Sequence, residues 1–343
     1  MTAVGFGLLT LVLSLLLPFA VRPLLLRLGV MDVPTARSSH ERPVLRGLGL
    51  AVLMAMVVGG VTSLGVIAPA DPSWPLLAAV VATSFAAGLV GFAEDLRGLS
   101  VSVRSAFLLL LAGVAMAALV WIGAPAAGSA IAQWPLWGQL LLAVYGVLFV
   151  SSYVNVANFM DGLNGISGFH GVIAGLTFAV AGILSDQVWL LAAGAILAGG
   201  FAGFLPWNLS RPGAFLGDVG SYLLGGAVAV TSIAALVSGV PVLATIGPMI
   251  ISFGDVGVTL VRRVREGKRW DEPHKEHVYQ RLQQLGASHV AASGVNAGFS
   301  LVAAALGLLS FALPPVWWIA LLVAGLAWLA LYLALPRLLA SRA

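Results

Sequence analysis

The sequence predicts an all-α, polytopic integral membrane protein with about eleven transmembrane helices, built as a single membrane domain over residues 1–343. Three observations support this prediction. Of the 343 residues, 60% are hydrophobic and only 9% are charged, whereas a water-facing surface needs far more charge. The mean hydropathy is +1.03. The charged residues also fall into short loops between apolar stretches, which leaves no room for a large soluble domain.

Eleven apolar stretches are long enough to cross a bilayer. They cover residues 3–21, 47–68, 75–93, 105–123, 136–158, 165–184, 188–207, 219–239, 241–261, 290–312 and 316–335. All 17 Lys and Arg residues lie after odd-numbered stretches or in the C-terminal tail, and the other loops contain only Asp71 and Asp186 as charged residues. Because cytoplasmic loops are enriched in Lys and Arg, the N-terminus is predicted outside and the C-terminus in the cytoplasm.

Composition also excludes several classes of site. The chain contains no cysteine, so it has no disulfide framework, no thiolate metal site and no catalytic thiol. Its pI is near 9.8, but the basic residues lie in short loops between spans. That pattern indicates membrane topology and not nucleic-acid binding. The last two spans carry Trp317, Trp318 and Trp328 without a polar signal and are interpreted as scaffold.

A polar stretch between the fifth and sixth spans is the strongest candidate site. Its polar residues recur every three positions and lie on one side of a helix end: Asn155, Asn158, Asp161 and Asn164. An acid and three amides at the end of a span are costly unless water, an ion or a ligand meets them. The alternative is an ordinary polar loop between two spans.

Acidic residues mark three further positions. Glu94 and Asp95 are adjacent at the end of a span, and a cation would keep both charged, although a solvated acidic loop is the alternative. Asp218 lies between glycines where a span begins, a suitable place for a metal-bound phosphate. Asp255 lies inside the ninth span and is a functional candidate, with pairing to Arg262 of the same helix as the alternative.

Two basic loops follow odd-numbered spans. The first, residues 29–46, contains Arg37, Ser39, His40 and Arg46. Its arginines and hydroxyls could grip an anionic head group, or could anchor the topology alone.

The larger basic loop, residues 262–289, places His274, His277 and Arg281 on one face if it is helical. Zinc binding would need a third ligand, which the sequence does not offer. A diphosphate clamp fits better.

Together these loops predict a site at the lipid–cytosol boundary for one soluble and one membrane-dissolved substrate. Carboxylates and amides suit Mg²⁺ or Mn²⁺, with substrate phosphates completing the coordination, so the residues predict metal-assisted phosphoryl chemistry on a lipid. The loops expected to form the site are residues 29–46, 94–104, 159–165, 208–218 and 262–289. A transporter or flippase is the competing class, but neither an internal repeat nor a matched pair of interrupted helices is present.

Four motifs together resemble a known family. Gly-Phe-Ala-Glu-Asp, Asn-Val-Ala-Asn-Phe-Met-Asp-Gly-Leu-Asn-Gly, Phe-Leu-Gly-Asp-Val-Gly-Ser and His-x-x-His occur in the same order in the polyprenyl-phosphate N-acetylhexosamine-1-phosphate transferases (glycosyltransferase family 4). The first loop and the eleventh span resemble the O-antigen-initiating branch. The resemblance implies transfer of a HexNAc-1-phosphate from a UDP-N-acetylhexosamine to undecaprenyl phosphate, releasing UMP. It also implies a bacterial inner-membrane location, an active site facing the cytoplasm, and a first membrane step of O-antigen or other cell-envelope glycan synthesis. A homodimer in the lipid bilayer is allowed, and no nucleic acid is expected.

The resemblance assigns roles residue by residue. Catalytic roles fall on Glu94, Asp95 and Asp218. Mg²⁺, or Mn²⁺ in its place, is expected on Asp218, Asp161 and Asp95. Substrate contacts are expected from Asn155, Asn158, Asp161, Asn164, Arg37, Ser39, His40, Arg46, His274, His277 and Arg281. A direct displacement and a covalent aspartyl intermediate both fit.

Three positions depart from the family pattern. Glu94 and Asn164 stand where an aspartate and an acid are usual, and Leu48 interrupts Arg-Gly-Gly-Gly. Because Asp218 and Asp161 are retained, an active enzyme is expected.

Overall fold

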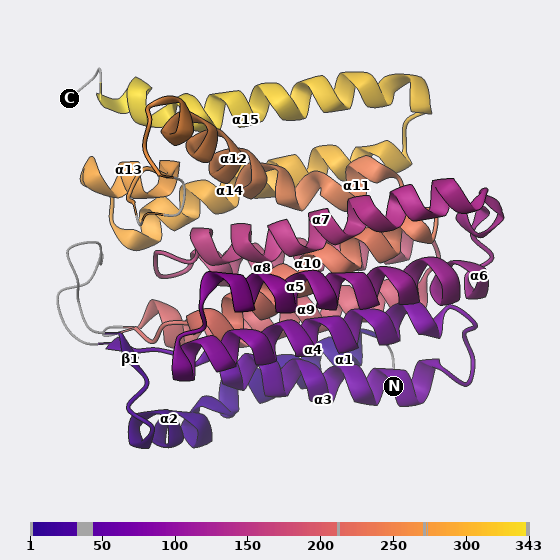
Figure 1. Cartoon of the computed structure of the whole chain (residues 1–343), viewed down its shortest axis with the longest axis horizontal. Coiled ribbons are helices and arrows are strands. Elements are labelled where there is room, and N and C mark those ends of the chain that lie inside the picture. Colours follow the sequence, from indigo (N-terminus) through magenta and orange to yellow (C-terminus); the bar gives the residue numbers. More distant parts are fainter. Residues whose placement is uncertain (1–2, 33–43, 211–212, 270–271, 273, 341–343) are drawn as a thin grey trace.

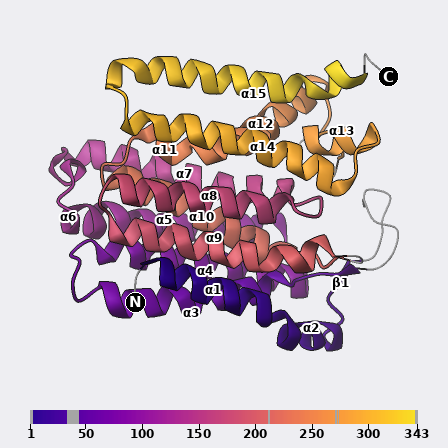
Figure 2. The same cartoon turned by 180° about the vertical axis from the view of Figure 1, so that it is seen from behind.

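The fold is seen in a computed structural model that describes residues 3–32, 44–210, 213–269, 272 and 274–340. The all-α prediction is confirmed, because long helices run side by side in one bundle (Figures 1 and 2). The described residues form only two strands, β1 (Met31–Asp32) and β2 (Val44–Leu45). These pair antiparallel with Met31 opposite Leu45.

Within the described residues, ten helical segments are long and apolar enough to cross a membrane. They are Gly49–Ile67 (α3), Trp74–Arg97 (α4), Val101–Ala126 (α5 and α6), Leu136–Met160 (α7), Ile166–Leu184 (α8), Val188–Leu209 (α9), Gly217–Val237 (α10), Val242–Arg265 (α11 and α12), His289–Phe311 (α14 and a 3₁₀ turn) and Pro315–Ala340 (a 3₁₀ turn and α15).

The remaining predicted span, residues 3–21, is a bent pair of helices. α1 (Ala3–Leu16) and α2 (Pro18–Arg27) meet at an angle of 42°. Pro18 stands at the break, where its ring and missing N–H interrupt the helical ladder. Counting this pair as one span gives the eleven that the sequence predicts.

Two of the spans are interrupted, and the helix α13 (Val278–Gln284) is too short to cross a membrane. α5 (Val101–Ala118) continues through a π-helical turn (Leu119–Gly123) into α6 (Ala124–Ala126). α11 (Val242–Ile246) and α12 (Ile250–Arg265) are separated by a 3₁₀ turn that contains Pro248. The bounds of the other C-terminal helices are Val278–Gln284 for α13, His289–Leu308 for α14 and Trp318–Ala340 for α15.

The centre of the bundle is α10. Buried residues make up 94% of the most apolar 18-residue segment of α10, against 11% for the corresponding segment of α15. The helix packs against α3, α4, α7 and α8. Helices in lipid are not driven together by the hydrophobic effect, so they associate by close packing, which small residues allow. A Cβ atom on Gly225, for example, would lie 2.6 Å from the Cα atom of Val154 in α7. The start of α10 is therefore held in a fixed place relative to its neighbours.

One end of the bundle carries β1, α2, α13 and the C-terminus, whereas α1 begins nearer the other end (Figures 1 and 2). At the first end, residues 45–49 are hydrogen-bonded to residues 215–216. The N–H of Phe215 donates to Leu45 O (2.8 Å), and the N–H groups of Leu48 and Gly49 donate to Phe215 O (3.1 Å) and Leu216 O (2.9 Å). We call this pairing the strap. It places Arg46 beside the first turn of α10.

Candidate active site

Two aspartates from neighbouring helices form the centre of the site. Asp95 lies in the last turn of α4 and Asp218 in the first turn of α10. Arg46 joins them, because its Nε lies 2.9 Å from Oδ1 of Asp95 and its Nη2 lies 2.6 Å from Oδ2 of Asp218. The Asp95 side chain is 0% exposed and that of Asp218 is 15% exposed. Asp218 is thus the carboxylate of the pair that a ligand can reach.

Asp95 also caps the N-terminus of α10. It accepts hydrogen bonds from the main-chain N–H groups of Asp218 (3.0 Å) and Val219 (2.9 Å). A carboxylate at a helix N-terminus satisfies N–H groups that have no partner within the helix and is stabilised by their dipoles. Asp95 consequently fixes where α10 begins, and with it the position of Asp218.

Glycines make this close approach possible. A Cβ atom on Gly91 would lie 2.1 Å from the carbonyl oxygen of Asp218, and one on Gly217 would lie 2.7 Å from Oδ2 of Asp95. Gly217 also has φ +75° and Gly47 has φ +85°, a region of backbone conformation that favours glycine. The glycines around Asp218 are therefore required by contact and by backbone geometry.

The end of α7 supplies the next group. The Asn158 amide donates to Oδ1 of Asp218 (2.7 Å) and lies 3.0 Å from the Ser221 hydroxyl. Asp161, the residue after α7, accepts a hydrogen bond from the Ser167 hydroxyl (2.6 Å). The structure thus brings Asn158, Asp161 and Asp218 together from segments far apart in the sequence.

The electrostatics of Asp161 reflect this crowding. The pKa of Asp161 is raised to about 7, mainly by burial and also by the nearby carboxylates of Asp218 and Asp95, while Ser167 and Arg46 oppose the shift. A group with a raised pKa resists carrying negative charge beside other acids. A cation between these carboxylates would relieve the repulsion.

Glu94 does not share the contacts of its neighbour Asp95. Its carboxylate accepts a hydrogen bond from the main-chain N–H of Leu99 (2.7 Å) and lies 3.4 Å from Nη1 of Arg104. Adjacent residues on a helix point in different directions. Only one of the two acids can therefore face α10, and that acid is Asp95.

The other amides of the central stretch bond to the main chain. Asn155 donates to Ser151 O within α7 (2.9 Å). Asn164 donates to the main-chain carbonyl oxygen of Asn208 at the end of α9 (2.8 Å), and the side-chain amide oxygen of Asn208 accepts from Gly165 N–H. In this structure Asn164 and Asn208 connect the loop before α8 to the end of α9.

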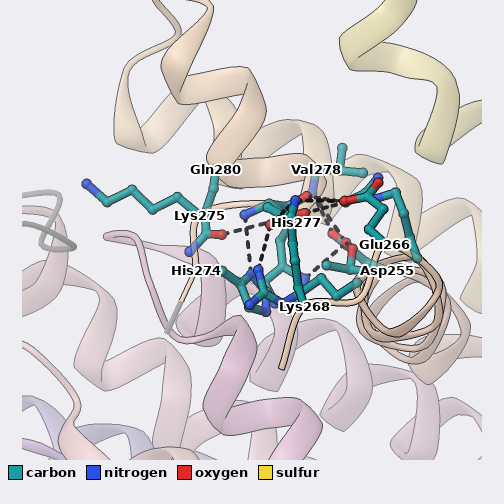
Figure 3. A network of polar contacts seen from close by, with 12 residues as sticks. Asp255, Glu266, Lys268, His274, Lys275, His277, Val278 and Gln280 are labelled. Carbon is teal, nitrogen blue, oxygen red and sulfur yellow. Dashed lines mark hydrogen bonds and ion pairs between the residues drawn. The ribbon is translucent and has the colours of Figure 1, made fainter. Parts of the chain in front are cut away.

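The segment that carries His274 and His277, residues 274–289, is called the histidine loop, and Figure 3 shows Asp255 in its network of polar contacts. Asp255 is 0% exposed and lies 3.2 Å from Nδ1 of His277. It does not pair with Arg262, whose guanidinium contacts Glu276 instead. The rings of His274 and His277 are 4.9 Å apart between centroids, and those of His277 and Tyr279 are stacked at 5.8 Å.

The basic residues around this loop converge on Glu276. Its carboxylate lies 2.6 Å from Nη1 of Arg263, 3.4 Å from Nζ of Lys268 and 3.5 Å from Nη2 of Arg262. Arg281 lies in the last turn of α13, where burial and the positive charge of Arg262 lower the pKa of its guanidinium. Arg37, Ser39 and His40 lie outside the described residues.

The donor set fits a hard divalent cation that substrate phosphates complete. Across the described residues, no three His, Asp or Glu side chains are grouped to hold an ion. Mg²⁺, however, commonly binds through one or two carboxylates together with phosphates and water. Asp218 and Asp161 would supply such carboxylates. Both oxygens of Asp95 already accept hydrogen bonds from α10, so Asp95 supports Asp218 here.

Several residues of the site were not predicted from the sequence. Ser167 and Ser221 contact Asp161 and Asn158, and Ser221 was inside a quoted motif. The interpretation of the last two spans as plain scaffold was incomplete, because Tyr332 of α15 donates to Asp255 at 3.2 Å. A tyrosine hydroxyl in an otherwise apolar span was a signal for such a partner.

Comparison with known proteins identifies relatives that cover most of the chain. Residues 77–236 match the family described as glycosyl transferase family 4. The chain is 30% identical, over 304 residues, to a decaprenyl-phosphate N-acetylglucosaminephosphotransferase of Mycobacterium tuberculosis, covering 78% of this chain and 72% of that protein. It is 27% identical over 287 residues to a probable undecaprenyl-phosphate N-acetylglucosaminyl 1-phosphate transferase of Bacillus subtilis (81% and 77%). A phospho-N-acetylmuramoyl-pentapeptide-transferase of Symbiobacterium thermophilum is 31% identical over 248 residues (67% and 72%).

Proposed function

This chain belongs to glycosyl transferase family 4, and from that premise we propose that it transfers a HexNAc-1-phosphate from a UDP-sugar to undecaprenyl phosphate. The products would be UMP and a polyprenyl-diphosphate-linked sugar. The names of the relatives support N-acetylglucosamine as the first sugar to test and a polyprenyl phosphate as the acceptor. The first loop and the eleventh span favour the O-antigen-initiating branch, and the reaction would be the first membrane step of a cell-envelope glycan.

The observation that carries the proposal is the contact of Asp218 with Asp95, Arg46 and Asn158 at the basic end of the bundle. Carboxylates, an amide and a guanidinium in one place can hold a diphosphate and its cation. Because Lys and Arg gather on the cytoplasmic side of membrane proteins, the site would face the cytoplasm. UDP-sugars would reach it from there, and the lipid phosphate from the bilayer.

In the proposed reaction, an oxygen of the lipid phosphate attacks the sugar-bound phosphorus, and the bond from that phosphorus to the bridging oxygen breaks as UMP leaves. Mg²⁺, held by Asp218 and Asp161, would neutralise charge on the phosphates. Asn158 would keep Asp218 oriented through its 2.7 Å hydrogen bond. Arg46, 2.6 Å from Asp218, is placed to contact a phosphate oxygen as well.

The test is UMP release by the purified protein with undecaprenyl phosphate, Mg²⁺ and a panel of UDP-N-acetylhexosamines. Asp218→Asn is expected to abolish release, because it removes a charge from the proposed cation site. Asp186→Asn is the matched control, since Asp186 is exposed in a loop between α8 and α9. Equal release by wild type and Asp218→Asn would refute the role of Asp218. No release with any sugar would count against the proposed reaction.

A further inference from the structure

Asp255 is a buried acid that the proposed chemistry does not use. Four donors converge on its carboxylate: Nδ1 of His277 at 3.2 Å, the main-chain N–H of Val278 at 3.0 Å, and the hydroxyls of Tyr332 at 3.2 Å and Thr259 at 3.3 Å. They come from α12, the start of α13 and α15. A buried charge surrounded by donors is stable only if those donors stay in place, so Asp255 holds three segments together.

The contact with Asp255 determines how the His277 ring carries its proton. An ionised carboxylate can only accept hydrogen bonds, so the ring nitrogen that faces it must carry the proton. The proton of a neutral His277 ring then lies on Nδ1, and Nε2 is left as the acceptor. The contact of the His277 ring with Asp255 is made through Nδ1. The contact with Asp255 thus defines which nitrogen of His277 can accept a hydrogen bond.

A second contact fixes this loop against residues 159–165, here called the Asp161 loop. The Tyr279 hydroxyl donates to Phe159 O (3.0 Å) near the end of α7. A Cβ atom on Gly162 would lie 2.5 Å from that hydroxyl. His277 stacks on Tyr279, and Tyr279 lies against Phe159 and Gly162 of the Asp161 loop. The histidine loop is therefore positioned by Asp255 of α12 and by the end of α7.

We infer that Asp255 is a positioning residue. It holds His277 with Nδ1–H toward the bundle so that Nε2 is presented as a hydrogen-bond acceptor beside the Asp161 loop, and Tyr332 of α15 supports it. The inference rests on the proposed function, because it gives His277 a place in the same site. Asn296 of α14 extends the support by donating to the Tyr332 hydroxyl (2.9 Å). The C-terminal helices thus contribute to the site through Asp255.

The discriminating variant is Asp255→Asn, which keeps the shape but has one acceptor oxygen in place of two. The main-chain N–H of Val278 can only donate, whereas the His277 ring can change tautomer. The amide oxygen should therefore face Val278, and the amide NH₂ should face Nδ1. That arrangement would move the ring proton to Nε2.

The tautomer can be read directly, because the chain contains only five histidines. Nitrogen NMR of ¹⁵N-histidine-labelled full-length protein, without substrates, is expected to show an Nδ1–H tautomer that disappears in His277→Gln. Asp255→Asn is expected to convert that signal to Nε2–H. The same tautomer in wild type and Asp255→Asn would overturn the inference.

The second test measures activity in a double-mutant cycle that combines Asp255→Asn with His277→Gln. Asp255→Asn should lower kcat/KM for UMP release about 10- to 100-fold, as loss of a group that orients another ligand-binding residue typically does. In the His277→Gln background it should cost less than about twofold. Equal losses in both backgrounds would assign Asp255 a general structural role and overturn the inference.

Tyr332→Phe guards against a variant that fails to fold, since it removes one donor and keeps the ring. It should lower kcat/KM about 2- to 10-fold in the wild-type background only and should leave the tautomer unchanged. An equal loss in the His277→Gln background would again overturn the inference. A wild-type protein without transferase activity would refute the proposed reaction, while the nitrogen spectra would still decide whether Asp255 sets the tautomer of His277.

Discussion

Gly91→Ala tests most directly whether the packing of α4 against α10 sets the site. A Cβ atom at Gly91 would lie 2.1 Å from the carbonyl oxygen of Asp218, 2.5 Å from its carbonyl carbon and 2.8 Å from Val219 N. All three atoms are main chain, so no side-chain rotation can relieve the contact. One helix must move by roughly 1 Å, and overpacking of this kind costs about 1–3 kcal/mol.

That movement would also disturb the cap on α10. The hydrogen bonds that the N–H groups of Asp218 (3.0 Å) and Val219 (2.9 Å) donate to Asp95 cross the same interface. Losing one hydrogen bond to a charged group costs about 1.5–3 kcal/mol. A 1 Å displacement of a reacting group can cost about 100-fold in rate. We therefore expect Gly91→Ala to lower UMP release by about 100-fold and to lower the midpoint of thermal unfolding in detergent.

The control is Gly113→Ala in α5, where a Cβ atom would meet nothing within 4 Å. Alanine there should leave UMP release unchanged and stabilise the helix by about 0.5–1 kcal/mol. If Gly91→Ala behaves like Gly113→Ala in both measurements, the close contact of α4 with Asp218 is wrong. The reasoning on the cap of α10 would then fail with it.

Two other predictions concern single side chains. Asn158→Ala removes the hydrogen bond to Asp218 and the contact with Ser221 and should lower kcat/KM for UMP release about 10- to 100-fold; an unchanged value would mean that Asp218 is oriented without Asn158. His274 has a pKa lowered from 6.5 to about 4, first by burial and then by His277 and Arg263. The unfolded chain therefore binds the proton more readily between these values, and folding stability should fall as the pH drops through this window. His274→Gln should weaken that dependence of the unfolding midpoint, and an identical pH profile in the variant would contradict the burial of this ring.

The spans could be predicted because apolar length and loop charge are local properties of the sequence. The bend at Pro18 and the break at Pro248 were also open to prediction from proline chemistry. The choice between Glu94 and Asp95 was not. Adjacent helical residues differ in direction, and which one faces α10 depends on the rotation of α4, set by contacts such as Gly91 against Asp218.

Long-range partners account for most of the remainder. Arg46 meets Asp218 because the strap brings residues 45–49 to residues 215–216. Asp255 could be identified as a candidate from its place inside a span. Its partners His277 and Tyr332 lie in other helical segments, and no spacing rule connects them. Such contacts follow from the packing of the whole bundle.

The strap also has a consequence for synthesis of the protein. Arg46 and Asp218 are 172 residues apart, so at ribosomal rates of about 5–20 residues per second the first half of the site waits roughly 10–30 s for the second. During that interval the N–H groups of α10 that bind Asp95 have not yet been synthesised, whereas Arg46 has. The Arg46–Asp95 ion pair, 2.9 Å in the finished protein, would then let the end of α4 settle in the membrane with its acid neutralised. We expect chains that lack Arg46 to be lost during insertion more often than chains that lack Asn158.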